Sequence, residues 1–199
     1  MKTTLSVLIL CISIICFSQN KKLKFHRFSL SFPVISTNTE NGNRSLAISI
    51  DTELKYKNHL FKSFLQAGAE LNISVFGPSR EVSFLETDIM YGRQLYLNNW
   101  LDISGFLGLG AFFESSSIPV RSTTSNSTSG VGWPGILDFS SITYTYSNNK
   151  ETTIGFPLQI ITRIKTYKKF FIGIQLHSNF NSISSIFGFG INLSWKFEK

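Results

Sequence analysis

Cysteine is almost absent from this chain: among 199 residues only Cys11 and Cys16 are cysteines, and both lie in an apolar segment near the N-terminus. If that segment is removed, the remaining chain has no thiol, which excludes disulfide bonds and cysteine metal sites. Long apolar runs are scarce as well. After the first segment, no stretch reaches the roughly 18 consecutive apolar residues that a transmembrane helix needs.

Histidine is also rare, and the three histidines, His26, His59 and His177, are far apart in the sequence. None of them belongs to a His-x-His or Glu-x-x-His spacing, so we expect no metal site. The segment 105–110 has the glycine content of a phosphate-binding loop. Because no helix is expected to follow it, we expect no nucleotide and no other cofactor.

The N-terminus has the pattern of a secretory signal peptide. A short basic start precedes the apolar run Leu5–Phe17, which is too short for a spanning helix. The small residues Cys16 and Ser18 predict cleavage after Ser18, so we expect a signal peptide at 1–18 and a single barrel domain at 19–199. A lipid anchor on Cys16 is an alternative, although the preceding residue is an isoleucine where a small residue is expected.

Basic residues outnumber acidic ones, 19 against 12, which gives a formal net charge of +7. This balance would suit nucleic-acid binding, but an exported chain rarely meets nucleic acid. The lysines also gather at particular turns and do not follow one binding stripe. We therefore expect no nucleic-acid partner and interpret the lysines as turn and lipid-headgroup contacts.

What the chain has in abundance is alternation of apolar residues with period 2, the period of a β-strand. In the last alternating segment Phe187, Ile191 and Trp195 share an apolar face, and Gly190 and Asn192 share the opposite face. Eight such segments can be marked: 24–34, 45–56, 61–76, 83–96, 100–113, 152–166, 169–181 and 185–197.

The connections between these segments alternate in length. Tight turns are predicted at 57–60, 97–99 and 167–168, and the longest loop is predicted at 114–151. Tight turns make neighbouring strands antiparallel. An even strand number with tight turns at one end and longer loops at the other is typical of outer-membrane barrels. We therefore predict an all-β fold, an eight-stranded antiparallel up-and-down transmembrane β-barrel with a long loop at 114–151.

A secreted lipocalin-like barrel is the main alternative, because it also has eight antiparallel strands, but its apolar face points inward. Two observations favour the membrane barrel. The polar face is rich in small residues and has charges of both signs, so we expect Glu70, Asp51 or Glu53 to pair inside with Arg27, Lys55 or Arg163. Aromatic residues gather near the segment ends, as in membrane-interface girdles. At the turn end these are Tyr56, Tyr96, Trp100, Tyr167 and Trp195, and at the loop end Phe32, Phe76, Phe84, Phe113, Phe180 and Phe187.

With its closing strand ending near Phe197, the chain resembles the small outer-membrane barrels of the OmpA/OmpX type in Gram-negative bacteria. The resemblance lies in pattern and architecture, and it covers nearly all of 19–199. It implies a monomer in outer-membrane lipid, inserted by the barrel-assembly machinery, with an interior filled by side chains and no open pore. Two features of the chain differ from the pattern of that family: the long loop, and the two residues Glu198 and Lys199 that follow the final aromatic.

The pair His177-Ser178 raises an enzymatic alternative, because lipid A deacylases are similar eight-stranded barrels that use a His-x-Ser pair. In that motif the two residues are two apart and share a face, so the imidazole can take the hydroxyl proton. Here the residues are adjacent and are expected to point to opposite faces. We therefore expect no catalytic residues and interpret His177 as a member of a polar network in the lumen.

The segment 114–151 is the remaining candidate for function. It is dominated by Ser, Thr, Gly and Asn, yet it contains Trp133, Tyr144 and Tyr146. Exposed aromatics on adaptable loops are common in recognition surfaces, so these three residues are predicted to bind an extracellular ligand. The alternative is that Ile142–Ser147 merely extends a barrel hairpin beyond the membrane. The sequence thus predicts a non-enzymatic, structural or surface-interaction role.

Overall fold

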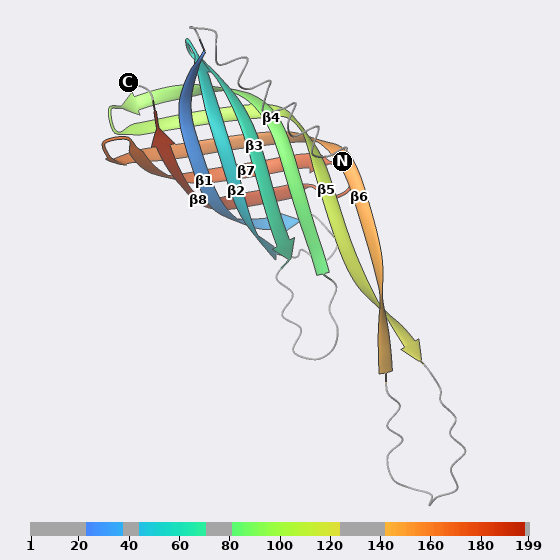
Figure 1. Ribbon diagram of the computed structural model, residues 1–199. Helices are drawn as coiled ribbons and strands as arrows, with labels where there is room; N and C mark the ends of the chain where they lie inside the picture. The colour runs from blue at the N-terminus through green and yellow to red at the C-terminus, as the bar shows by residue number, and fades with distance from the viewer. Residues whose placement is uncertain (1–22, 38–43, 71–80, 124–141, 198–199) are drawn as a thin grey trace, which may run out of the picture.

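The computed structural model describes residues 23–37, 44–70, 81–123 and 142–197. It contains eight strands: β1 Lys24–Thr37, β2 Arg44–Tyr56, β3 His59–Glu70, β4 Glu81–Asn98, β5 Leu101–Thr123, β6 Ile142–Tyr167, β7 Phe170–Asn181 and β8 Ile186–Lys196 (Figure 1). In these ranges no helix has the length and apolarity needed to cross a membrane. The predicted signal peptide lies outside the described residues.

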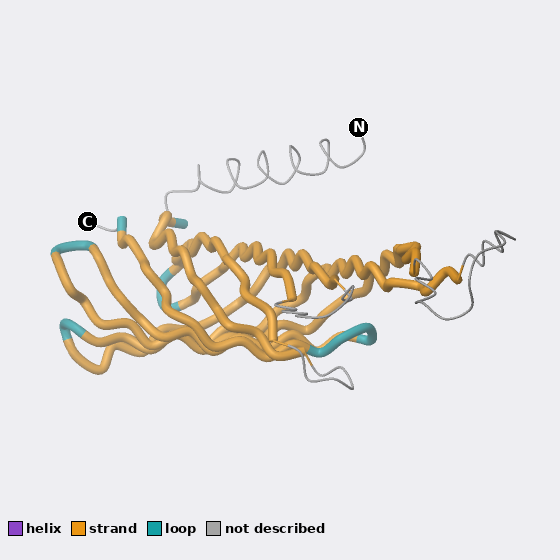
Figure 2. The backbone as a smooth tube through the Cα atoms, turned by 90° about the horizontal axis from the view of Figure 1, so that it is seen from below, coloured by secondary structure: helices purple, strands orange, loops and turns teal. Residues whose placement is uncertain are grey.

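The strands form a closed barrel in which each strand pairs antiparallel with its sequence neighbours and β8 pairs with β1. Short turns join β2 to β3, β4 to β5 and β6 to β7 at one end, and the β7–β8 loop lies at the other (Figure 2). Lys57 and Lys168 have φ angles of 53° and 33°, because these turns require the left-handed region at one position. The predicted fold class is thereby confirmed.

All eight predicted segments coincide with strands, but the prediction of a loop over 114–151 is wrong at both flanks. β5 continues to Thr123 and β6 begins at Ile142, and their pairing runs without a gap from Phe113 outward. β-branched and aromatic residues favour strands, which explains this extension. Figure 1 shows the β5–β6 hairpin projecting beyond the other strands. Residues 71–76 of the predicted third segment lie outside the described residues.

The exterior of the barrel is apolar on every strand. Phe32 and Ile191, which pair with each other near the middle of β1 and β8, each have about half of the residue exposed. This is the reverse of a lipocalin, whose exterior is polar. One exposed apolar residue from each strand illustrates the band: Phe32, Ile48, Leu65, Ile89, Leu107, Ile160, Ile174 and Ile191.

Most of the predicted aromatic residues are exposed near the ends of the exterior; the exceptions include Phe32, which lies near the middle of β1, and Tyr56, which is half-buried. Tyr96, Trp100, Tyr167 and Trp195 are exposed at the turn end, and Phe113, Phe180 and Phe187 toward the loop end. Phe84 was expected among the latter and is instead buried, because it shares the inward side of β4 with Glu86. Phe76 lies outside the described residues.

The interior is not uniformly polar. Leu60, Phe64, Met90, Phe106 and Ile161 form one buried apolar cluster. Ile161, which interrupts the polar alternation of its strand, therefore has a packing role. A second buried cluster lies nearer the loop end and consists of Ile35, Phe84, Phe112 and Ile186.

Candidate functional site

A balanced network of buried charges fills the barrel interior near the turn end. Three cations and three anions belong to it, contributed by β1, β2, β3, β5 and β6. Each of the six side chains is at most 2% exposed. The members are Arg27, Lys62, Arg163, Asp51, Glu53 and Asp102.

The geometry of this network is closely interlinked. Arg163 forms a very short contact with Glu53 and lies 3.5 Å from Asp102, while Arg27 lies 2.9 Å from Asp102 and 3.7 Å from Glu53. Lys62 lies 3.1 Å from Asp51. Because every charge has an opposite neighbour, the network offsets the large cost of burying ions. Its evident role is structural.

The predicted interior pairs are partly correct. Glu53 pairs with both Arg27 and Arg163. Lys55 was expected inside, but it is only half-buried near the turn end and its ammonium lies 3.5 Å from the Tyr96 hydroxyl. Lys165, two positions after Arg163 on β6, is exposed although the alternation would place it inside.

Two members of the network were not proposed as partners from the sequence. Asp102 lies on the predicted polar face of its segment, and the alternation would have placed it inside. Lys62 shares its inward side with Leu60 and Phe64, so the sequence pattern there does not resemble a polar lumen.

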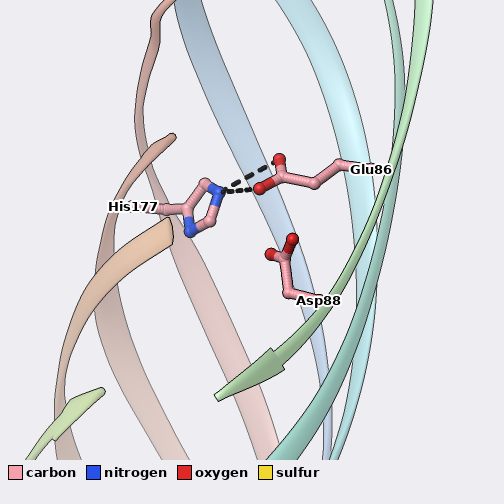
Figure 3. A group of neighbouring side chains, drawn as sticks. All are labelled: Glu86, Asp88 and His177. Atoms are coloured by element: carbon pink, nitrogen blue, oxygen red, sulfur yellow. Dashed lines mark hydrogen bonds and ion pairs between the residues drawn. The ribbon is translucent and has the colours of Figure 1, made fainter. Parts of the chain in front are cut away.

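A second polar group, with a different charge balance, lies nearer the loop end. His177 on β7 faces Glu86 on β4 across the barrel, with Nε2 at 3.0 and 3.1 Å from the two carboxylate oxygens (Figure 3). Asn179 donates to Glu86 Oε1 at 2.6 Å, and Gln66 donates to Oε2 at 3.4 Å. Asp88 also points into this group, and its carboxylate, the Glu86 carboxylate and the imidazole offer atoms within 4.8 Å of one another.

Asp88 differs from the other acidic groups of the interior. It is 2% exposed, and the one hydrogen bond recorded for it among the described residues is with Glu86, a contact that needs a proton on one of the two carboxyl groups. No arginine or lysine of the described ranges forms an ion pair with Asp88 or Glu86, whose one ion-pair partner there is His177. Two carboxylates and one imidazole thus form a buried group with too little positive charge.

The deacylase arrangement is not present at His177. The Ser178 hydroxyl donates to the carbonyl oxygen of Leu158 at 3.4 Å, whereas the imidazole faces Glu86. Ser178 pairs with Phe187, whose side chain is exposed on the exterior. The two adjacent residues therefore point to opposite sides, as the sequence predicts.

The structure places two of the three predicted ligand-binding residues on the β5–β6 hairpin. Tyr146 lies on β6 opposite Pro119 and is exposed. Tyr144 lies on the same strand opposite Arg121. Trp133 lies outside the described residues. Ligand binding by all three residues remains a prediction.

Comparison with known proteins identifies the fold. Neisserial surface protein A aligns over 88% of this chain and 99% of its own, with a TM-score of 0.59 and 8% identity. A major outer-membrane protein from Thermus thermophilus aligns over 87% and 100%, with a TM-score of 0.51 and 9% identity. The attachment invasion locus protein Ail of Yersinia pestis aligns over 88% and 99%, with a TM-score of 0.50 and 8% identity.

No protein-family profile matches the chain, and no curated protein sequence is significantly similar to it. At identities of 8–9% the structural likeness establishes the fold alone. The chain has the fold of the small eight-stranded outer-membrane barrels, as its sequence pattern suggested.

Proposed function

We propose that this protein is a monomeric outer-membrane barrel without enzymatic activity, which presents the β5–β6 hairpin as a surface-interaction element. The observation that carries the proposal is the apolar exterior, continuous over all eight strands and flanked by aromatics. Side chains such as Ile89 and Ile154 are 64% and 70% exposed and would be strongly unfavourable in water. Lipid is the environment in which this surface is stable.

The dimensions of the barrel agree with a membrane. From Phe187 to Phe197 the closing segment advances ten steps of about 3.3 Å, and a tilt near 40° projects this to roughly 25 Å, the height of an outer-membrane apolar band. Inside this band the charged network and both apolar clusters occupy the lumen. We infer that the barrel has no open pore.

Export and assembly complete this proposal. Residues 1–18 act as the secretory signal peptide, and the barrel-assembly machinery inserts the rest into outer-membrane lipid. Exposed Phe197, which follows β8, supports recognition of the closing strand by that machinery. In this orientation the tight turns face the periplasm and the hairpin faces the cell exterior.

The hairpin is suited to binding because it projects beyond its neighbours. The last residue of β5 that pairs with β4 is Ser117, opposite Glu81, and the first residue of β6 that pairs with β7 is Gly155, opposite Asn181. Residues 118–123 therefore extend roughly 20 Å past the described part of β4, at about 3.3 Å per residue. Exposed Ile118, Val120 and Tyr146 supply apolar and aromatic surface there.

The membrane part of the proposal is tested with the purified protein. In detergent micelles it should show β-type circular dichroism and migrate faster on a denaturing gel before boiling than after. Whole cells should yield it in the outer-membrane fraction. A chain that stays folded and monomeric in buffer without detergent would contradict the proposal.

The hairpin part is tested by replacing 118–147 with a short Gly-Ser turn, which removes the projecting surface and joins the paired residues Ser117 and Asn148. Loop-tip backbone contributes little to the core, so the unboiled variant should still migrate faster than the boiled one. Its binding to host-cell or matrix ligands on an array should be lost. Trp133→Ala should weaken that binding, whereas Trp100→Ala, a matched loss of one indole at the turn end, should not. Equal binding by all variants would contradict the role of the hairpin.

The enzymatic alternative has its own test. His177→Ala in whole cells should leave the acyl pattern of lipid A unchanged in mass spectrometry, because Ser178 is bound to a backbone carbonyl and not to the imidazole. A changed acyl pattern would favour a lipid-modifying enzyme.

A further inference from the structure

We propose that Glu86, Asp88 and His177 form a binding site for one divalent transition-metal cation, such as Zn²⁺, inside the barrel. The spacing along the chain gave no sign of such a site, because 91 positions separate Glu86 from His177. The barrel brings the residues together: β4 supplies both carboxylates and β7 supplies the imidazole across the lumen (Figure 3).

The geometry meets the first requirement of a metal site, which is a set of convergent ligand atoms. One oxygen from each carboxylate and one imidazole nitrogen lie within 4.8 Å of one another. Zinc binds such atoms at about 2.0–2.2 Å, so neighbouring ligand atoms in a complex are about 3–3.5 Å apart. His177 Nε2 and Glu86 already have that separation, at 3.0 Å. The Asp88 carboxylate oxygen lies within 4.8 Å of both of these atoms.

The second requirement is a net negative charge on the ligand group, which a bound cation would neutralise. Asp88 is almost completely buried, its recorded hydrogen bond is with the neighbouring Glu86 carboxyl, and no lysine or arginine of the described residues forms an ion pair with it. Glu86 beside it is also buried, and a neutral His177 leaves the group with two negative charges. A divalent cation would neutralise the pair, whereas burying two uncompensated carboxylates is costly.

The ligand types indicate which class of cation fits. Imidazole nitrogen suits zinc, copper, iron and nickel, whereas magnesium, calcium and manganese suit oxygen ligands. Three protein ligands leave a fourth position for water. Asn179 and Gln66 donate to the two oxygens of Glu86 and hold its carboxylate in place. Such outer contacts orient metal ligands in known sites.

Glycine provides the room that the site needs. A Cβ atom at Gly110 would collide with the Asp88 carboxylate, and one at Gly155 would collide with the side-chain amide of Asn179. The two glycines pair with each other across β5 and β6. They therefore form a wall without side chains next to the proposed ligands.

Apolar residues enclose the site on two sides. Phe84 and Phe112 stack at 5.7 Å toward the loop end, and the Phe64 ring lies 4.8 Å from the His177 ring on the other side. An enclosed site excludes bulk water, which strengthens the interaction of charges. We therefore expect a bound ion to exchange slowly.

The test uses the untagged chain, unfolded in EDTA and refolded into detergent micelles without metal. After incubation with Zn²⁺ and removal of free ion, mass spectrometry of the metal should find about one zinc per chain. X-ray absorption at the zinc edge should show one imidazole nitrogen together with carboxylate oxygens. Ni²⁺ should compete with zinc, and Mg²⁺ at the same concentration should not.

Substitutions locate the ion. Asp88→Asn should weaken zinc binding at least tenfold, and His177→Gln should remove it. Glu81→Gln on the same strand and His59→Gln in the turn region are the matched controls and should bind as the parent chain does. Faster migration of the unboiled sample than of the boiled sample on a denaturing gel verifies that each variant is folded.

Two results would overturn the proposal. One is a folded parent chain that retains no more zinc than the micelle blank, which would mean that protons satisfy the carboxylates. The other is retained zinc without imidazole in its absorption spectrum, or unchanged binding in folded Asp88→Asn. The parent-chain spectrum decides the question even if His177→Gln fails to fold. These readouts do not depend on the hairpin or on its ligand.

Discussion

Removal of Arg163 from the charged network should destabilise the barrel severely. Its guanidinium is fully buried and contacts Glu53, the Ser104 hydroxyl at 2.9 Å and the Asn192 side-chain oxygen at 3.3 Å. In Arg163→Met the three carboxylates of the network would face two cations. Removing one partner of a buried ion pair costs about 3–5 kcal/mol. Methionine fills much of the same volume, so we attribute the expected loss to charge and hydrogen bonding.

A second substitution separates charge balance from packing. Glu53→Gln removes the carboxylate that Arg163 contacts and, combined with Arg163→Met, restores equal numbers of cations and anions. Residues in one ion-pair network show interaction energies of about 0.5–3 kcal/mol. We expect the double variant to be more stable than the sum of the two single effects by about 2 kcal/mol, within that range.

The measurement is urea unfolding of the barrel in lipid vesicles, followed by tryptophan fluorescence. Lys165→Met is the matched control, because it removes an exposed cation two positions further along β6 and should change the free energy of unfolding by less than about 0.5 kcal/mol. The reasoning is refuted if Arg163→Met costs no more than this control, or if its effect adds to that of Glu53→Gln without coupling.

Two further predictions use the same unfolding measurement. Ile191→Arg, in the middle of the lipid-facing surface of β8, should cost about 2–4 kcal/mol, whereas Ile118→Arg on the projecting hairpin should be nearly neutral; similar costs at both positions would contradict the proposed membrane boundary. Ile161→Ala, in the buried apolar cluster, should cost about 2–5 kcal/mol, and clearly more than Ile160→Ala on the exterior of the same strand. Equal effects would mean that the cluster does not stabilise the barrel.

Strand number and orientation could be predicted from the sequence because one physical rule governs the exterior. Lipid contacts every strand, so each strand needs an apolar residue at every second position along its membrane-facing length. Ile191 and its neighbours on β8 obey the rule throughout. The rule applies only where lipid contacts the barrel, which is why 114–123 and 148–151 were expected to be loop. Extension of the hairpin by Ile142–Ser147 was predicted only as an alternative, and this alternative is confirmed.

Most interior contacts could not be predicted, because no single rule governs them; the pairing of Glu53 with Arg27 and Arg163 is the exception. An inward position accepts an apolar residue, a small residue or a paired charge, and β3 uses Leu60, Lys62 and Gln66 on the same side. Pairing across the lumen also depends on the register of strands that are not sequence neighbours. Glu86 meets His177 only because β4 and β7 face each other across the closed barrel.

The two polar groups of the lumen differ in their charge balance. Near the turn end, three cations offset three anions, and that balance needs nothing from outside the chain. Toward the loop end, Glu86 and Asp88 face one histidine and two amides. A lysine or arginine at this position would balance the carboxylates, as Lys62, Arg27 and Arg163 do in the network near the turn end. A buried group that lacks such a cation and is flanked by Gly110 has the charge and the room for an ion supplied by the surroundings.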